Sequence, residues 1–287
     1  MPELPEVETV RRGLEPCLVG VRLTRVEARR PDLRFPFPRN FTARLTGARV
    51  ERLDRRGKYL LAPLSTDETL IMHLGMTGRF QVEGGEVGRR PGAFALAAAA
   101  DPRHAHLVFE TEAGAVITFF DPRRFGFMDL VKGDAQVTYP AFAAMGPEPL
   151  GNQFHAHHLA EAFHGRRQAV KSLLLDQTIV AGLGNIYVCE ALHRARIAPF
   201  APAGRIALAR LERLTTAVRE VLEAAIAAGG SSLRDYADAS GALGYFQHDF
   251  RAYGREGEPC LTPGCKGRIR REVQGGRSTF HCSTCQR

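Results

Sequence analysis

The sequence predicts an α+β protein of several domains, and three features of the chain support this. Short runs of β-branched and aromatic residues, separated by Gly, Pro and Asp, fill the first half, and helical periodicity follows. Four of the six cysteines lie in the last 28 residues. A chain of 287 residues is long enough for two domains and a small appendix. We therefore expect an antiparallel β domain with a leading helix, a helical domain and a small cysteine-rich unit.

Composition and charge narrow the class of protein. Hydrophobic residues make up 44% of the chain and charged residues 24%, which is typical of globular proteins and argues against a disordered or fibrous chain. No segment approaches the roughly 18 consecutive apolar residues of a membrane span, and MPELPEVETV lacks the basic start of a secretion signal. We expect a soluble, cytoplasmic protein. Its formal net charge of +8 makes a polyanion the first partner to consider.

The first expected element is an amphipathic helix that begins after Pro5. Apolar residues recur at spacings of three and four from Val7 to Leu18, Pro5 suits the start of a helix, and Gly20 marks its end. The β-rich pattern then runs over about residues 21–131, in segments such as ETLIMHLGMTGRF and HLVFETEAGAVITFF. We expect these parts to form one N-terminal domain, residues 1–135.

Two segments lack regular periodicity. Residues 84–102 are rich in Gly and then in Ala, so we expect a loop within the β domain. Residues 136–152 contain several prolines and are expected to link the first domain to the next.

The second half of the chain reads as helical and then as a small basic unit. A helical domain is expected over residues 153–240, where the clearest helix runs from about 207 to 228 and stops at Gly229-Gly230. Residues 250–287 are expected to form the third unit, which holds eight Lys or Arg against three Glu.

The third unit contains a predicted metal site. Its cysteines are spaced as C-x4-C and C-x2-C, with 16 residues between the pairs, and this spacing predicts two knuckles on one tetrahedral Zn²⁺ with a two-stranded hairpin between them. Four thiolates leave no open coordination position, so the metal is expected to be structural. The alternatives are four free thiols, or His248 or His281 as a substitute ligand. The expected ligands are Cys260, Cys265, Cys282 and Cys285.

Basic residues of the same unit favour a phosphate-bearing partner, although they also fit a solvated basic face. Gly275 and Gly276 precede Arg277 and indicate a turn that brings this guanidinium into close contact with a ligand. The other residues of the basic set are Lys266, Arg268, Arg270 and Arg271.

The start of the chain carries candidate catalytic groups. Removal of Met1 would leave Pro2 with a free secondary amine, followed by Glu3 and Glu6. An α-amino group has a pKa of about 7.7 to 8.0, so part of it is neutral near pH 7 and can attack an aldehyde carbon. The resulting iminium is an electron sink for elimination, and Glu3 could move protons at the same centre. Alternatively, PELPE only starts a helix, where carboxylates favour the positive end of the dipole.

Several other segments combine turns with basic or aromatic side chains, and each also fits an ordinary turn or core role. Asn185 follows the glycines of AGLGN, whose backbone N–H groups suit an anion at a helix start. His104 and His106 could bind a metal or donate to phosphate. The remaining candidates are Lys58 in RRGKYLL, Met76 in HLGMTG, and Arg123, Arg124 and Phe125 in DPRRFG.

Eight segments spread over nearly the whole chain match the ordered motifs of one family. They are MPELPEVETVRRGLEP, GKYLL, HLGMTGRF, FDPRRFG, MGPEPL, DQTIVAGLGNIYVCEALHRARIAP, GYFQHDFRAYGREGEPC and GRSTFHCSTCQ. The chain thereby resembles the bacterial formamidopyrimidine-DNA glycosylases, which are related to endonuclease VIII. The resemblance implies an N-terminal β-sandwich, a helix-two-turn-helix motif in the helical domain and a C-terminal zinc ribbon hairpin.

The resemblance also implies a function. It is that of a bifunctional DNA glycosylase and AP lyase of base excision repair, which excises oxidised purines such as 8-oxoguanine and formamidopyrimidines from duplex DNA. A Schiff base on the N-terminal proline then allows β,δ-elimination. The implied partner is damaged double-stranded DNA, with one structural Zn²⁺ and no catalytic metal or nucleotide cofactor. We expect a monomer in the bacterial cytoplasm, associated with the nucleoid through DNA.

Residue roles follow from the same resemblance. The catalytic set is Pro2 as nucleophile, Glu3 as general acid and base, Lys58 and Arg277, with Glu6 as the supporting carboxylate. The expected DNA contacts are His104, Arg123, Lys171 and Asn185. The side chains expected to fill the gap in the duplex are Met76, Arg123 and Phe125, with Arg123 facing the orphaned cytosine.

Three segments depart from the family pattern. The first knuckle is C-x4-C where many members have C-x2-C, residues 94–100 are alanine-rich, and the expected lesion-capping loop over 231–246 differs in detail. Base preference is therefore less defined than the reaction type.

Three alternatives remain. A DNA-binding module without catalysis would predict damage at Pro2, Glu3 or Lys58, which are intact. An endonuclease VIII preference for oxidised pyrimidines would be expected to show PEGPE in place of PELPE. A metal-dependent nuclease would need a carboxylate cluster for Mg²⁺, and the sequence shows no such spacing.

Overall fold

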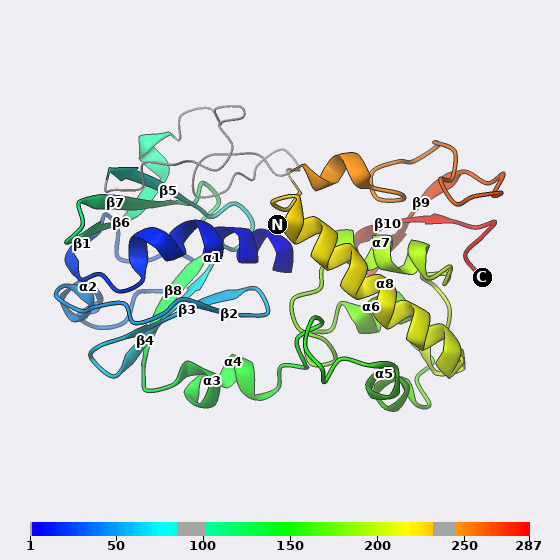
Figure 1. Ribbon diagram of the computed structural model, residues 1–287, viewed down its shortest axis with the longest axis horizontal. Helices are drawn as coiled ribbons and strands as arrows, with labels where there is room; N and C mark the ends of the chain where they lie inside the picture. The colour runs from blue at the N-terminus through cyan, green and yellow to red at the C-terminus, as the bar shows by residue number, and fades with distance from the viewer. Residues whose placement is uncertain (1, 85–100, 232–244) are drawn as a thin grey trace. The chain divides into compact units, whose positions relative to one another are not determined.

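The structure, a computed structural model, describes residues 2–84, 101–231 and 245–287 (Figure 1). The expected loop at 84–102 and the alanine-rich residues 94–100 fall almost entirely outside this described part. Within it, no helix is both long enough and apolar enough to cross a membrane.

The chain divides into two compact units. Unit 1 consists of Met1–Ala143 and Ala228–Tyr245, and unit 2 of Ala144–Ala227 and Phe246–Arg287. The first boundary falls inside the proline-containing segment where a linker is expected. The expected capping loop over 231–246 lies in this second part except for Phe246, which belongs to unit 2, and its residues 232–244 are outside the described part.

Unit 1 contains two four-stranded antiparallel sheets. The first has the order β1-β6-β7-β5, with β1 (Leu23–Ala28), β6 (Ala105–Thr111), β7 (Ala115–Phe120) and β5 (Arg79–Gly84). The second has the order β2-β3-β4-β8, with β2 (Asp54–Arg56), β3 (Tyr59–Leu64), β4 (Glu68–His73) and β8 (Phe127–Lys132).

Both sheets contribute to one buried core. Leu60 and Met72 of the second sheet and Phe109 and Phe119 of the first belong to the same apolar cluster. Two sheets that share a core in this way form a β-sandwich, with alternate side chains pointing inward. The predicted antiparallel sandwich is confirmed.

Helix α1 (Leu4–Leu18) places one apolar face on that core. Val7, Val10 and Leu14 recur at three and four residues, lie on one side of the helix and are buried. Pro5 stands in the first turn, where a helix tolerates the missing N–H. The helix contacts β2 and β3, so the predicted leading helix is confirmed.

Short helical turns complete the described part of unit 1. The helix α3 (Ala135–Thr138) begins after Asp134, whose side chain accepts the N–H of Gln136. Together with α4 (Pro140–Ala143) it occupies part of the segment where a linker was expected, so this stretch has local structure. The turns are α2 (Phe41–Leu45), η1 (Pro102–His104), α3 (Ala135–Thr138) and α4 (Pro140–Ala143).

Unit 2 is helical, and its longest helix is α8 (Leu208–Ala227), which matches the helix predicted over 207–228. This helix contacts α5 (Ala156–Phe163) and α7 (Asn185–Arg194). Gly229 and Gly230 follow with positive φ, a conformation that ends helices. The other helical elements are α5 (Ala156–Phe163), α6 (Val170–Leu174), α7 (Asn185–Arg194), η2 (Ala203–Arg205) and η3 (Phe246–Asp249).

A two-stranded hairpin lies near the C-terminus of unit 2. Strands β9 (Ile269–Gln274) and β10 (Arg277–Cys282) pair antiparallel, and Gln274 faces Arg277 across the turn. Gly275 and Gly276 form the turn with φ of 57° and 73°, which glycine adopts without strain. The predicted hairpin between the two cysteine pairs is confirmed.

Candidate active site and metal centre

The N-terminal residues of unit 1 place two buried carboxylates next to Pro2. Pro2 is buried, and Glu3 and Glu6 are 3% and 2% exposed. The backbone N–H of Glu3 donates to Glu6 Oε2 over 2.8 Å. This bond spans the first turn of α1 and satisfies one of the N–H groups that a helix start leaves without a partner. The three expected residues Pro2, Glu3 and Glu6 therefore lie together.

Glu6 also binds a residue that follows the long helical segment of the chain. Its Oε1 accepts the backbone N–H of Ser231 over 2.8 Å and the Ser231 hydroxyl over 3.0 Å. A Cβ on Gly230 would approach the Glu6 side chain to 3.2 Å, and Gly230 has φ of +82°, so a glycine fits this close contact. Ser231 pairs with Tyr245. Glu6 thus holds the backbone and the side chain of Ser231.

Lys58 lies on the tight turn between β2 and β3. Gly57 makes this turn with φ of +55°. The guanidinium of Arg55 donates to the Gly57 carbonyl over 2.9 Å and to Glu8 Oε2 over 3.2 Å. Since Glu8 lies on α1, Arg55 fixes the turn that carries Lys58 against the helix that follows Glu3. Arg55 was not among the residues expected from the sequence, although it begins the RRGKYLL segment.

His73, at the end of β4, is a second residue that was not expected from the sequence, although it begins the HLGMTG motif. Its ring contacts those of Tyr59 and Phe127, with centroid distances of 4.8 and 5.3 Å. Burial, together with the charges of Lys58 and Arg34, lowers the pKa of His73 to about 4. The ring is therefore neutral near pH 7. Its Nδ1 accepts the N–H of Gly75, so its proton lies on Nε2.

One buried carboxylate, that of Asp121, joins two turns. The first turn carries Met76, and the second carries Arg123 and Phe125. Asp121 is fully buried and accepts the Thr77 hydroxyl over 2.5 Å and the Gly126 N–H over 2.7 Å. The guanidinium of Arg123 stacks on Phe125 at 4.7 Å from the ring centroid. Phe125 is 44% exposed.

Glycine at position 75 allows this close approach of the two turns. A Cβ there would lie 2.2 Å from the backbone nitrogen of Gly126. The structure therefore brings the expected gap-filling turns together. Asp121 begins the DPRRFG motif and was not among the site residues expected from the sequence.

The two histidines of RHAH differ in their surroundings. His104 ends the short η1 turn and is half-buried. His106 is buried, and its Nε2 lies 2.9 Å from the Asp121 carbonyl oxygen. Burial lowers the pKa of His106. His106 therefore supports the backbone of the Arg123 turn, and His104 is the one of the pair that a ligand can reach.

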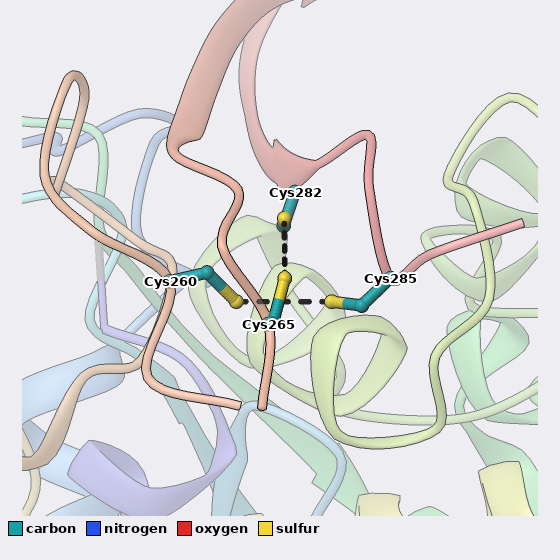
Figure 2. A group of neighbouring side chains, drawn as sticks. All are labelled: Cys260, Cys265, Cys282 and Cys285. Atoms are coloured by element: carbon teal, nitrogen blue, oxygen red, sulfur yellow. Dashed lines mark hydrogen bonds between the residues drawn. The ribbon is translucent and has the colours of Figure 1, made fainter. Parts of the chain in front are cut away.

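The four clustered cysteines of unit 2 point toward one another (Figure 2). Their sulfur atoms all lie within 4.8 Å of each other. The distances from Cys260 to Cys285 and from Cys265 to Cys282 are both 3.7 Å. A tetrahedron of thiolates at about 2.3 Å from Zn²⁺ has edges of about 3.8 Å, so the donor set fits a tetrahedral ion.

Within the described residues, the structure favours cysteines over histidine as the ligand set. The only group there that could hold a metal is the set of four cysteines, and it includes no histidine. His281 Nε2 lies 2.9 Å from Glu272 Oε1 instead. A Cβ on Gly267 would approach Cys282 Sγ to 2.6 Å, so glycine is required where the chain passes over this sulfur.

Lys171 and Asn185 both donate to the hairpin strand β10. The Lys171 ammonium is bonded to Thr279 Oγ1 over 2.7 Å and to the Ser278 carbonyl over 3.2 Å. Asn185 Nδ2 donates to the same Ser278 carbonyl over 2.9 Å. Lys171 is 1% exposed, and burial and the charge of Arg277 lower its pKa. These two expected DNA contacts therefore hold the strand that begins at Arg277.

Comparisons with known proteins agree with this arrangement. The family model described as "Formamidopyrimidine-DNA glycosylase N-terminal domain" matches residues 1–128, and "Formamidopyrimidine-DNA glycosylase H2TH domain" matches residues 145–237. Both describe parts of a DNA glycosylase, which defines the class of protein. The second match covers the helical region where the helix-two-turn-helix motif was expected.

Full-length relatives and solved structures define the family. Formamidopyrimidine-DNA glycosylases from Caulobacter sp. (strain K31) and Phenylobacterium zucineum are 66% and 64% identical, each over 100% of both chains. The crystal structure of MutM (Fpg) from Thermus thermophilus is 40% identical with a TM-score of 0.83, over 99% of this chain and 98% of that one. Lactococcus lactis Fpg in complex with abasic-site DNA is 33% identical with a TM-score of 0.85, over 100% of both. The chain belongs to the formamidopyrimidine-DNA glycosylase family.

Proposed function

We propose that this protein is a bifunctional DNA glycosylase and AP lyase that excises oxidised purines from duplex DNA and then cleaves the strand. The observation that carries the proposal is the buried pair Glu3 and Glu6 directly after Pro2, at the start of α1. A secondary amine flanked by positioned carboxylates has the groups that imine chemistry at a sugar carbon requires.

The reaction begins after Met1 is removed. The Pro2 nitrogen forms a bond to C1′ of the damaged nucleotide, the glycosidic C–N bond breaks, and the base leaves with a proton. The sugar ring opens as Glu3 donates a proton to its oxygen, which gives an iminium. Loss of a C2′ proton then breaks the C3′–O bond, and a second elimination breaks the C5′–O bond. Water hydrolyses the remaining iminium and restores the Pro2 amine.

In unit 1, Lys58 supplies a positive charge for the phosphate beside the lesion. Arg55 holds its turn against α1, and the neutral His73 nearby offers an Nε2–H donor. A cation and a neutral donor together suit a phosphate oxygen, because charge-assisted hydrogen bonds to phosphate are strong. His104 provides a further phosphate contact on this unit.

In unit 2, Arg277 grips the phosphates that flank the extruded nucleotide. Asn185 begins the ten-residue helix α7, whose N-terminal N–H groups favour a phosphate. For Lys171 we propose an indirect role, because its buried ammonium already donates to β10. Lys171 places the strand that carries Arg277.

Extrusion of the damaged base costs a few kcal/mol of stacking and pairing. Met76, Arg123 and Phe125 offset this by filling the gap in the duplex, with Arg123 opposite the orphaned cytosine. The stacked and exposed Arg123–Phe125 pair supports this role, since an aromatic ring beside a cation suits a base stack.

Two observations support the proposed substrate class. The chain has PELPE near its start, where a preference for oxidised pyrimidines would be expected to show PEGPE, and solved relatives were crystallised with damaged DNA. One solved relative, a Lactococcus lactis Fpg mutant that is 34% identical, was crystallised with Fapy-dG containing DNA. We propose 8-oxoguanine and formamidopyrimidines in duplex DNA as the substrates, and Zn²⁺ as the ion that Cys260, Cys265, Cys282 and Cys285 hold. The Zn²⁺ is structural and folds the hairpin. We further propose that the protein is a monomer in the bacterial cytoplasm.

Borohydride trapping tests the proposal. Borohydride reduces an iminium to a stable amine, so the wild-type protein should become covalently attached to a duplex with 8-oxoguanine opposite cytosine. The cross-linked peptide should begin at Pro2. A Pro2→Gly variant should trap far less. A protein with one extra residue before Pro2 should give no cross-link at Pro2, since the Pro2 nitrogen is then an amide and is not a nucleophile. If the wild type binds the duplex without trapping, the lyase mechanism is wrong and the non-catalytic DNA-binding alternative is favoured.

A further inference from the structure

A buried histidine lies against the sulfur cluster of unit 2. His193 belongs to the last turn of α7 and is 1% exposed. Its Nε2 lies 3.3 Å from Cys260 Sγ, within hydrogen-bonding distance for sulfur. This residue lies in the motif GNIYVCEALHRARIAP and is not among the residues expected to contact DNA or to coordinate the metal.

The surroundings of the ring select one tautomer. His193 Nδ1 is buried and has no hydrogen-bond partner within the described residues. A proton on Nδ1 would leave a buried N–H without an acceptor, which costs more than leaving a lone pair without a donor. The neutral ring therefore carries its proton on Nε2, and that proton points at Cys260 Sγ.

A metal-bound thiolate benefits from such a donor. Four thiolates around a divalent ion carry a net charge of about −2, which a partly buried site must stabilise with N–H or O–H groups. The knuckles supply some of these: Thr262 N–H lies 3.5 Å from Cys260 Sγ, and Gly267 N–H lies 3.4 Å from Cys265 Sγ. His193 differs because it is a side chain from another element of unit 2.

The helix that carries His193 contacts the C-terminal segment at two more places. Asn185, at its start, donates to the Ser278 carbonyl of β10. Glu190, which is 1% exposed, accepts the backbone N–H groups of residues 251, 252 and 253 over 2.7 to 2.9 Å. Helix α7 therefore contacts Cys260, the hairpin strand β10 and residues 251–253, which precede the first cysteine pair.

We propose that His193 is an outer-sphere ligand of the metal centre, which donates its Nε2–H to the Cys260 thiolate and so couples metal retention to helix α7. The inference rests on the proposed metal site. His193 is a positioning residue and does not coordinate the ion. Outer-sphere partners of this kind typically change metal affinity about 10- to 100-fold when they are removed.

Cobalt and zinc binding by the full-length protein test this proposal. Co²⁺ in a thiolate site gives a sulfur-to-metal charge-transfer band, and loss of a hydrogen bond to sulfur moves that band to lower energy. We expect His193→Phe to show this shift and to release Zn²⁺ to a chromophoric chelator about 10- to 100-fold faster than the wild type. His193→Gln should restore both, because its Nε2 amide N–H can reach the same sulfur.

A matched control uses a histidine that lies beside a ligand but does not contact sulfur. His281 precedes Cys282, and its ring binds Glu272, so His281→Phe should leave the charge-transfer energy unchanged. A wild-type protein without any thiolate charge-transfer band would overturn the metal site itself. If the wild type has the band and His193→Phe matches it in energy and in release rate, the metal site stands and the role of His193 is overturned.

Discussion

The carboxylate of Glu6 accepts two hydrogen bonds from Ser231, one from its backbone N–H over 2.8 Å and one from its hydroxyl over 3.0 Å. The other carboxylate oxygen accepts the N–H of Glu3 over 2.8 Å. One side chain thus joins the residue proposed as the general acid to the chain that enters the 231–245 segment.

Replacement of Glu6 by Gln should disturb this junction. An amide has one acceptor oxygen and one NH₂ group, so either Glu3 or Ser231 would face a donor in a buried place. We expect a loss of about 1 to 3 kcal/mol in the free energy of unfolding, measured by urea denaturation, and slower borohydride trapping.

Ser231→Ala is the control for Glu6→Gln, since it removes only the hydroxyl and leaves the backbone bond. Its expected cost is about 1 kcal/mol. Equal losses in the two variants would contradict the proposed importance of the Glu3 bond.

Arg55 should matter for catalysis because it holds the Lys58 turn. Arg55→Lys keeps the charge but cannot bind Glu8 and the Gly57 carbonyl in the same fork geometry, so we expect slower trapping on the lesion duplex. Arg12→Ala serves as control, because Arg12 also binds Glu8, over 2.9 Å, but its side chain is 58% exposed and lies on α1 itself. If both variants trap at the wild-type rate, the turn does not depend on Arg55.

His73 should make stability depend on pH in one window. Its pKa of about 4 in the folded protein lies below the usual 6.5, so between these values the unfolded chain binds a proton that the folded chain does not. Stability from this group is therefore fully present above pH 6.5 and falls as pH decreases toward 4, by up to about 1.4 kcal/mol per pH unit.

Urea unfolding at several pH values, for wild type and His73→Gln, isolates this contribution. The difference in unfolding free energy between the two proteins should change between pH 6.5 and pH 4 and should be constant above pH 6.5. A difference that is independent of pH would show that His73 titrates normally.

Lys171 and Arg277 should respond differently to salt. A side chain that neutralises a phosphate adds to the salt dependence of DNA binding, and its loss lowers the slope of log affinity against log salt by about 1. We expect Arg277→Met to lower the slope. Lys171→Met should weaken binding with an unchanged slope, because its ammonium is bonded to β10. A reduced slope for Lys171→Met would instead indicate direct phosphate contact.

Metal removal should unfold the C-terminal hairpin. Its own apolar cluster is small and includes Cys260 and Cys282 themselves, so the ion supplies much of its stability. We expect one metal ion per chain by elemental analysis, and loss of both metal and DNA binding in Cys265→Ser. Cys17→Ser is the control, since Cys17 is buried in the sandwich core and should not change the metal content.

Local patterns in the sequence predicted the leading helix, the long helix of the second unit, the hairpin and the four-cysteine cluster. The three-and-four spacing from Val7 to Leu18 predicted α1, the pattern over 207–228 predicted α8, and Gly275-Gly276 predicted the hairpin turn. The cysteine spacing predicted a four-sulfur cluster. These features depend on neighbours in the chain, so periodicity, turn residues and ligand spacing record them directly.

Contacts between distant residues were decided only by the tertiary structure. Nothing local to Glu6 indicates Ser231, nothing in KSLLLD shows that the Lys171 ammonium is buried against β10, and nothing in ALHRAR places His193 beside Cys260. The low pKa of His73 likewise depends first on the burial of its ring and then on the charges of Lys58 and Arg34, which come from other parts of the chain. Hydrogen bonds and pKa values arise from which groups share a buried volume, and only the folded chain determines that.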